Sequence, residues 1–161
     1  MVRHAKLSDM QRVLEIYAVA RQYMRDNGNP TQWGDSYPEE EALLADIEAK
    51  RLFVCEDGGV ISGVFMFIIG DEPTYAVIED GEWPSNDPYG TIHRVASDGV
   101  RGGVFDECIA FCRGQMPCLR IDTHHNNLTM QHLIERSDFD YCGVIYVPDG
   151  SPRKAYQWNK P

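Results

Sequence analysis

The hydrophobic positions of the first fifty residues recur with the period of a helix. Met10, Val13 and Tyr17 fall on one face of residues 8–26, which this spacing predicts to be an amphipathic helix. The Asn-Gly-Asn-Pro segment at 27–30 indicates a stop, because these residues tolerate left-handed backbone and proline does not continue a helix. Capping-box spacings predict helix starts near residues 8 and 36, and the second helix should extend to about residue 51.

The pattern changes to that of strands after residue 51. Residues 52–56 and 60–69 are rich in β-branched and aromatic side chains and are separated by Asp-Gly-Gly, which predicts a hairpin. Residues 71–88 are polar and contain three prolines, with one short β-like piece at Tyr75 to Ile78. This stretch should therefore be mostly loop.

Strands and helices then alternate to the end of the chain. The predicted strands are residues 90–97, 119–123, 141–147 and 155–158. Apolar helical faces follow the glycines at 99–103 and the Asn126-Asn127 pair, which has the chemistry of a helix cap. A mixed sheet with helices on both faces accounts for this order of elements.

Composition and charge limit the classes of function. The chain has 161 residues, 43% of them hydrophobic, as expected for a single domain over residues 1–161. Lys+Arg 15 against Asp+Glu 25 gives a net charge of −10, which disfavours nucleic acid and membrane surfaces and favours a cationic ligand such as an amine. No membrane-spanning run or signal segment is present, so we expect a cytoplasmic protein.

The five cysteines lie mostly in apolar stretches, which predicts reduced core thiols. Cys108 and Cys112 have helical spacing and, together with His124 and His125, leave a zinc site open as an alternative. Because no Cys-x-x-Cys pair occurs, we expect no metal.

The turn after residues 90–97 carries the main chemical signal. It reads Gly99-Val100-Arg101-Gly102-Gly103 and leads directly into a predicted helix. A pyrophosphate needs several convergent backbone N–H donors, which glycines and a helix N-terminus provide. Arg101 would add positive charge.

This order of elements, with strand, glycine turn and helix at its centre, resembles the GNAT superfamily of acyl-CoA-dependent N-acetyltransferases. In that family the turn has the form Gln/Arg-x-x-Gly-x-Gly/Ala, and its N–H groups hold the CoA pyrophosphate. With Gly103 as the motif glycine, Val100 takes the Gln/Arg position and Phe105 the Gly/Ala position. A second stretch, from Asn127 to Phe139, is similar to the family's Asn-x-x-Ala-x-x-Leu-Tyr-Glu-Lys-x-Gly-Phe.

The resemblance implies a GNAT-like α/β fold, with a central mixed, mostly antiparallel sheet and helices on both faces. It also implies acetyl-CoA as cosubstrate. The residues that would contact it are Val95, Ala96, Ser97, Val100, Arg101, Gly102, Gly103, Val104, Phe105 and Asn127. For Asn127, a plain helix N-cap is an equal alternative.

Acyl transfer to an amine needs a base and a donor for the oxyanion. The resemblance implies that N–H groups near Val95 and Ala96 polarise the thioester carbonyl. The base candidates are His93, because histidine titrates near neutrality, and Glu79 in the acidic loop. A structural histidine and a solvated charge run are the alternatives. Ile134 stands where many family members carry a tyrosine acid.

Acceptor contacts in this family usually come from the loop between the first two helices. Here Trp33 and Tyr37, beside Asp35, could form an amphipathic wall for a small-molecule or peptide amine. The alternative is that both rings staple the helices to the sheet. A homodimer is compatible with the sequence.

Three functions follow from these observations. We favour an acetyl-CoA-dependent N-acetyltransferase that acts by direct transfer. The second is an acyl-CoA-binding module without turnover, which Phe105 and Ile134 would allow. The third is a thiol or zinc protein built on the Cys108, Cys112 and histidine set.

Overall fold

Seven strands form one mixed sheet in the order β1-β2-β3-β4-β5-β7-β6. The computed structural model describes residues 1–161. The strands are β1 (Val2–His4), β2 (Leu52–Asp57), β3 (Val60–Ile69), β4 (Gly90–Ser97), β5 (Cys118–Thr123), β6 (Asp140–Tyr146) and β7 (Pro152–Asn159). The helices are α1 (Met10–Asp26), α2 (Glu40–Glu48), α3 (Val104–Gln115) and α4 (Leu128–Arg136), with 3-10 turns η1 (Leu7–Asp9) and η2 (Pro73–Tyr75). β4 and β5 are parallel, whereas β1–β2, β2–β3, β5–β7 and β6–β7 are antiparallel, which confirms the predicted mixed, mostly antiparallel sheet.

The chain forms two compact units, each made of two separate stretches. Unit 1 comprises Met1–Phe67 and His93–Phe111, and unit 2 comprises Ile68–Ile92 and Cys112–Pro161. The boundaries fall inside β3, β4 and α3, so these three elements contribute residues to both units. That residues 1–161 act as a single domain stays a prediction.

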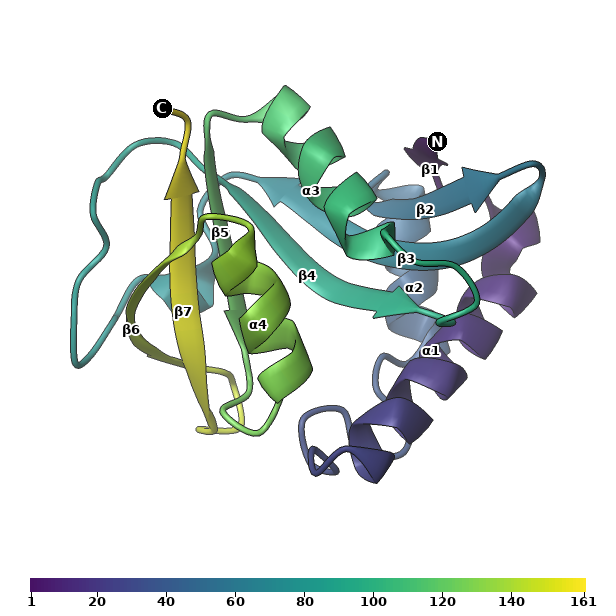
Figure 1. Cartoon of the computed structure of the whole chain (residues 1–161), viewed down its shortest axis with the longest axis horizontal. Coiled ribbons are helices and arrows are strands. Elements are labelled where there is room, and N and C mark those ends of the chain that lie inside the picture. Colours follow the sequence, from purple (N-terminus) through teal and green to yellow (C-terminus); the bar gives the residue numbers. More distant parts are fainter. The chain divides into compact units, whose positions relative to one another are not determined.

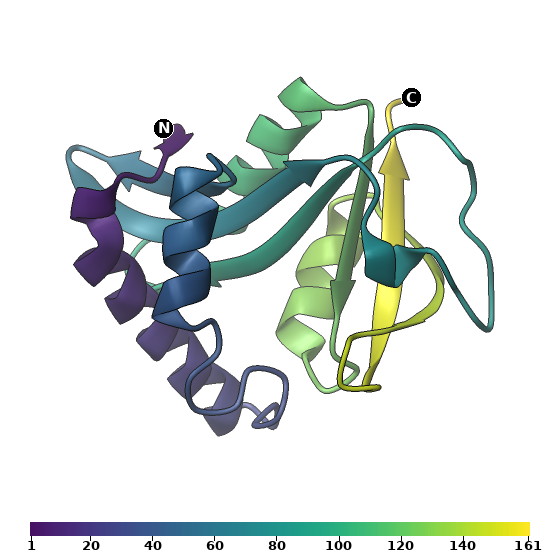
Figure 2. The same ribbon diagram turned by 180° about the vertical axis from the view of Figure 1, so that it is seen from behind.

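Unit 1 has helices on both faces of its strands. α1 and α2 lie on one face of β2 and β3, and α3 lies on the other (Figures 1 and 2). The ring of Phe111 on α3 lies 5.0 Å from that of Phe53 and 6.1 Å from that of Phe65. On the other side, α1 buries Val13 and Tyr17 as its hydrophobic spacing predicts.

Unit 2 encloses a small aromatic core. Its buried members are Tyr75, Tyr89, Cys118, Ile145 and Ala155. The Arg120 guanidinium lies between two rings, 3.9 Å from the centroid of Trp83 and 4.0 Å from that of Tyr89. α4 covers one face of β5 and β7, and η2 lies on the other (Figures 1 and 2). This core attaches the long 70–89 loop to the strands.

The prediction of a β-like piece at Tyr75 to Ile78 is wrong. η2 occupies Pro73–Tyr75, since proline presets the backbone for a tight turn and offers no N–H to a strand. Only Glu79 pairs with a strand, through an isolated antiparallel bridge to Val144 of β6.

The predicted capping box at Ser8 and Gln11 also does not form. α1 begins at Met10 without a side-chain cap, because η1 precedes it directly. Asp9 instead turns back along the chain and accepts a hydrogen bond from the Lys6 N–H at 2.8 Å.

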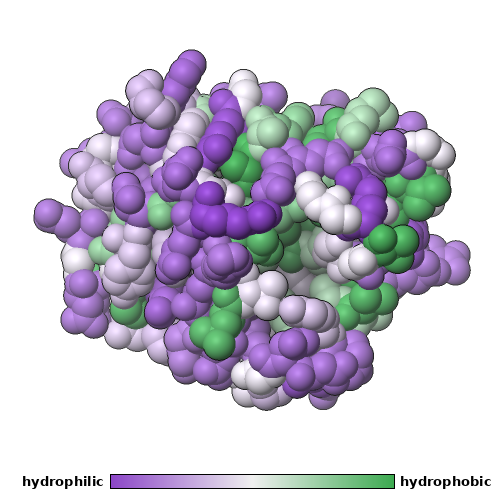
Figure 3. All heavy atoms as spheres, in the orientation of Figure 1, coloured by the Kyte–Doolittle hydropathy of each residue, from purple (hydrophilic) through white to green (hydrophobic).

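Hydrophilic residues cover most of the face drawn in Figure 3, and hydrophobic ones form small separate groups there. None of the helices has the length and apolar character that crossing a bilayer requires. All five cysteines are buried thiols. The structure contains no group of three or more His, Cys, Asp or Glu side chains that could hold a metal ion.

Candidate functional site

The turn between β4 and α3 is fixed by its own polar groups. Asp98 accepts a hydrogen bond from the Val100 N–H at 3.0 Å and pairs with Arg12 of α1. Gly103 has a φ of 80°, in the left-handed region that favours glycine. Its carbonyl accepts from the Glu107 N–H at 3.0 Å, which begins α3. The turn therefore presents the start of a twelve-residue helix in one defined position.

The start of α3 lies unusually close to the sheet. A methyl group added to Gly63 of β3 would lie 2.3 Å from Cγ1 of Val104, so this approach requires glycine. Val104 and Phe105 are 5% and 7% exposed, so both side chains face the interior. The first N–H groups of a helix have no intrahelical partner, and the turn glycines have open space where side chains would begin. This arrangement fits an anionic group such as a pyrophosphate.

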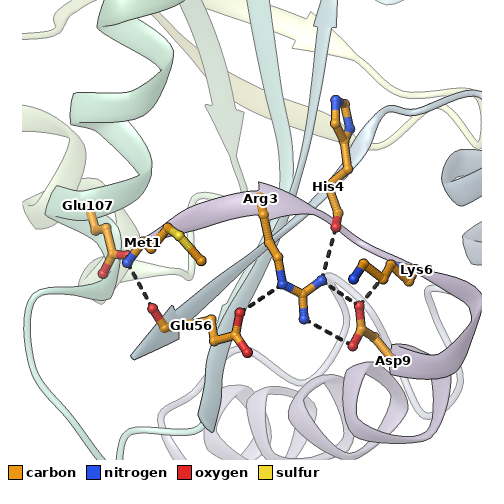
Figure 4. A network of polar contacts seen from close by, with 7 residues as sticks. All are labelled: Met1, Arg3, His4, Lys6, Asp9, Glu56 and Glu107. Atoms are coloured by element: carbon orange, nitrogen blue, oxygen red, sulfur yellow. Dashed lines mark hydrogen bonds and ion pairs between the residues drawn. The ribbon is translucent and has the colours of Figure 1, made fainter. Parts of the chain in front are cut away.

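Arg101, which we expected to add charge to this turn, is already paired. Its Nη2 lies 2.8 Å from Oε2 of Glu107, whose Oε1 lies 2.7 Å from the Met1 amine. Figure 4 shows that amine between Glu107 and the Glu56 carbonyl, beside Arg3. Burial alone would raise the pKa of Glu107, but hydrogen bonds from the Met1 amine and Arg101 bring the pKa below its ordinary value. The net charge that Arg101 lends to the turn is correspondingly small.

β4 pairs with β5 along only the first part of its length. The parallel ladder to β5 ends at the pair Ile92↔Ile121, so Val95 and Ala96 lie beyond it. Arg94 adopts a φ of 53°, which is uncommon for any residue except glycine. Its carbonyl accepts a hydrogen bond from Tyr17 Oη at 2.7 Å.

The Arg94 side chain joins a cluster that sequence reasoning missed. Its Nε donates to Tyr37 Oη at 2.9 Å, and its Nη1 donates to Asp46 Oδ2 of α2. Asp46 is 3% exposed and also forms an ion pair with Arg51, whose Nη2 lies 3.4 Å from Asp46 Oδ1. We call Tyr37, Asp46 and Arg94 the guanidinium cluster. Only the burial of an acidic residue within a predicted helix could have signalled it, and its partner lies 48 residues away.

The two aromatic residues proposed for the acceptor differ in exposure. Trp33 is 9% exposed and packs edge-on against Tyr17, with ring centroids 5.5 Å apart. Of the two interpretations of Trp33, its burial against α1 agrees with packing rather than with an exposed wall for the acceptor. Tyr37 is 40% exposed and lies 6.2 Å from the Trp33 ring.

The two base candidates fall in different units. His93 is half-buried on β4 in unit 1. Glu79 is exposed in unit 2, where its Oε2 accepts a hydrogen bond from Tyr146 Oη at 2.9 Å. This bond raises the pKa of Tyr146, since it stabilises the protonated phenol.

Asn127 caps α4, as one of its two interpretations predicted. Its Oδ1 accepts from the Met130 N–H at 3.0 Å. Ile134, at the position of the family's tyrosine, is fully buried. Asp138, at the family's glycine position, has a φ of 64°, so it supplies the left-handed helix stop that a glycine would.

Unit 2 holds one further polar pair that the sequence did not reveal. Tyr75 Oη donates to Asp122 Oδ2 at 2.6 Å. Burial, followed by the charge of Asp122, raises the pKa of Tyr75 well above its ordinary range. Tyr75 is therefore a neutral donor that fixes the orientation of Asp122.

The structural neighbours of this chain along its full length are GNAT-family acetyltransferases. One is a GNAT-family acetyltransferase from Streptococcus agalactiae, with TM-score 0.89, 28% identity, and coverage of 100% of this chain and 95% of that chain. A GNAT-family acetyltransferase from Listeria monocytogenes has TM-score 0.72 and 19% identity, covering 99% and 94%. The chain thus has the GNAT acetyltransferase fold, which confirms the resemblance.

A third neighbour was solved with the expected cosubstrate. It is a GNAT-superfamily phosphinothricin acetyltransferase from Sinorhizobium meliloti in complex with acetyl-CoA, with TM-score 0.64, 13% identity, and coverage of 99% and 88%. No protein-family model matches this sequence, and no curated protein does so either.

Proposed function

We propose that this protein is an N-acetyltransferase that moves an acetyl group from acetyl-CoA directly to the amine of a small-molecule or peptide acceptor. The observation that carries the proposal is the glycine turn leading into α3, in a chain with the GNAT fold. The second candidate, a module that binds acyl-CoA without turnover, is supported by Ile134, an apolar and buried residue at the position where many family members carry a tyrosine acid.

The cofactor contacts would come mainly from backbone. N–H groups from Gly102 to Phe105, at the start of α3, would bind the pyrophosphate, because their helix dipole favours anions. Arg101 would contribute the part of its charge that Glu107 leaves unbalanced. Val100 and Ser97 would border the turn, and Asn127 would contact the pantetheine arm.

Acetyl-CoA would supply a thioester: the amine nitrogen bonds to its carbonyl carbon, the C–S bond breaks, and a proton leaves nitrogen and finally reaches sulfur. The N–H groups of Val95 and Ala96 would donate to the carbonyl oxygen. His93 or Glu79 would accept the amine proton. Tyr37 would border the acceptor, and the buried Trp33 would support the Tyr37 ring from behind.

Two measurements test this function. Acetyl-CoA at about 100 times its dissociation constant should stabilise the fold by about 2.7 kcal/mol, seen as a higher melting temperature. Thiol release over small amines, polyamines, amino acids and peptide N-termini should then reveal turnover. Absence of stabilisation would reject both CoA functions, and binding without thiol release would favour the module.

The base is tested by the pH dependence of thiol release. His93→Ala should flatten the profile if His93 accepts the proton, with Glu79→Gln as the matched comparison. A profile unchanged in His93→Ala but flattened in Glu79→Gln would move the role to Glu79.

A further inference from the structure

The Arg94 guanidinium has donors that the protein does not use. A guanidinium carries five N–H groups, and the two hydrogen bonds to Tyr37 and Asp46 occupy Nε and one position on Nη1. Nη2 makes no hydrogen bond. It is not one of the buried side-chain atoms that lack a partner, so it is in contact with solvent. The side chain is 17% exposed, so a ligand can reach this end of the guanidinium.

The charges around Arg94 do not cancel. Asp46 is the carboxylate that binds both Arg94 and Arg51, so two positive groups share one negative group. The cluster therefore has a local excess of one positive charge in a chain whose net charge is −10. An anionic group on the ligand would balance it.

The backbone directs Arg94 to this position. Its φ of 53° lies in a region that arginine seldom adopts, and Tyr17 Oη holds its carbonyl. Unusual backbone that is fixed by surrounding contacts occurs most often at functional sites. Arg94 also lies between His93, a base candidate, and Val95, whose N–H is proposed to polarise the thioester. Arg94 therefore belongs to the same segment of β4 as the residues proposed for the chemistry.

From these contacts we infer that Arg94 binds a carboxylate of the acceptor, so that the acceptor is an amino acid rather than a simple amine. This inference rests on the proposed function and specifies its substrate class. A guanidinium matches a carboxylate in plane and spacing, whereas the overall negative charge of the chain suits the ammonium group of the same zwitterion. Tyr37 and Asp46 are positioning residues, because they orient the guanidinium.

The test compares each common amino acid with its own carboxamide. The amide keeps the amine and side chain but removes the negative charge. Binding is measured by calorimetry and by melting temperature, with and without CoA. At least one amino acid should bind about tenfold or more tightly than its amide, since a hydrogen bond to a charged group is worth about that factor. If no amino acid exceeds its amide, the inference is overturned.

Variants separate recognition from a structural role. Arg94→Lys keeps the charge but loses the planar fork, so the preference for the carboxylate should fall about tenfold while amide binding is unchanged. In Asp46→Asn the amide oxygen can still accept the hydrogen bond from Arg94 but carries no negative charge. The preference for the amino acid over its carboxamide should therefore persist or grow. Arg3→Lys removes the planar fork of an arginine that binds Asp9 and Glu56 from β1, so it is the matched control and should keep the wild-type preference for the carboxylate. If Arg94→Lys loses affinity for the amino acid and for its carboxamide equally, Arg94 has a structural role and the inference is overturned.

The outcomes also distinguish the two proposals. Acetyl-CoA binding and thiol release without any preference for carboxylates would leave the proposed function intact and reject the amino-acid acceptor. Failure of acetyl-CoA to bind would reject the proposed function, whatever the comparison of amino acids with their carboxamides shows. If Arg94→Lys does not fold, the wild-type comparison of acid and amide still decides, and Arg94→Gln supplies the second variant.

Discussion

The glycine turn and the guanidinium cluster are built in opposite ways, although both lie in unit 1. The turn uses the backbone of consecutive residues, 98–104, and its glycines keep space open in front of a helix end. The cluster uses side chains from three elements, with Tyr37 and Asp46 lying 57 and 48 residues from Arg94. A site made of consecutive backbone is visible in the sequence, whereas a site made of distant side chains appears only once the chain is folded.

The largest expected effect is on the stability of the cluster. Asp46→Ala leaves Arg94 without its carboxylate and should lower the free energy of unfolding by about 3 kcal/mol. This figure is at the low end for a buried pair because the Arg51 partner is 40% exposed. Urea denaturation measures the change, and acetyl-CoA affinity of the folded variant should stay as in wild type. A large loss of acetyl-CoA affinity would mean that turn and cluster are not separate sites.

A substitution in the glycine turn should lower the affinity for acetyl-CoA more than it lowers the free energy of unfolding. Gly103→Val places a branched side chain at a φ of 80° in front of the α3 N–H groups, and should weaken acetyl-CoA binding about 100-fold. Gly58→Val, also at positive φ with open space but in the β2–β3 turn, is the control for strain alone. Equal acetyl-CoA affinities in the two variants would contradict a phosphate site at residues 98–104.

At the turn, removing the charge of a side chain should lower acetyl-CoA affinity less than obstructing the backbone N–H groups does. Arg101→Gln should reduce acetyl-CoA affinity only about threefold, because Glu107 already balances most of that charge. Calorimetry at low and high salt checks this value. A loss as large as that of Gly103→Val would show that the arginine, and not the backbone, holds the anion.

The smallest effect concerns pH. The pKa of Glu107 lies below its ordinary value near 4.5 when the protein is folded, so its contribution to stability is complete above 4.5 and is lost as the pH falls through the folded pKa. Denaturation at about pH 6 and about pH 3.5 should show a smaller acid loss in Glu107→Gln than in wild type, by under about 1 kcal/mol. Identical acid losses would contradict the pairing.

The elements follow from the sequence because their causes are local. The predicted strand 90–97 agrees with β4 residue for residue, and the glycine turn leads into α3 as its chemistry indicates. The piece at 75–78 fails since a β-rich composition does not overcome the proline that begins η2. The fold class follows from the order of these elements.

The candidate site is predicted less completely. Trp33 had two interpretations in the sequence, a wall for the acceptor and packing against the helices, and only its contact with Tyr17 in the folded chain separates them. The pairing of Asp46 with Arg94 has no sequence signal, since a helix whose charged residues are all acidic looks like a solvated one until its buried face is known. Likewise, Glu107 neutralises the charge of Arg101 only because the first turn of α3 brings the two side chains together, and composition does not reveal that contact.

Amide NMR during a titration with acetyl-CoA tests the central claim most directly, because it reports on each backbone N–H separately. We predict the largest shifts at the N–H groups from Gly99 to Phe105, and much smaller ones at Asp46 and Tyr37 while no acceptor is present. Saturable binding that leaves the amides from Gly99 to Phe105 unshifted would contradict a pyrophosphate site at the start of α3.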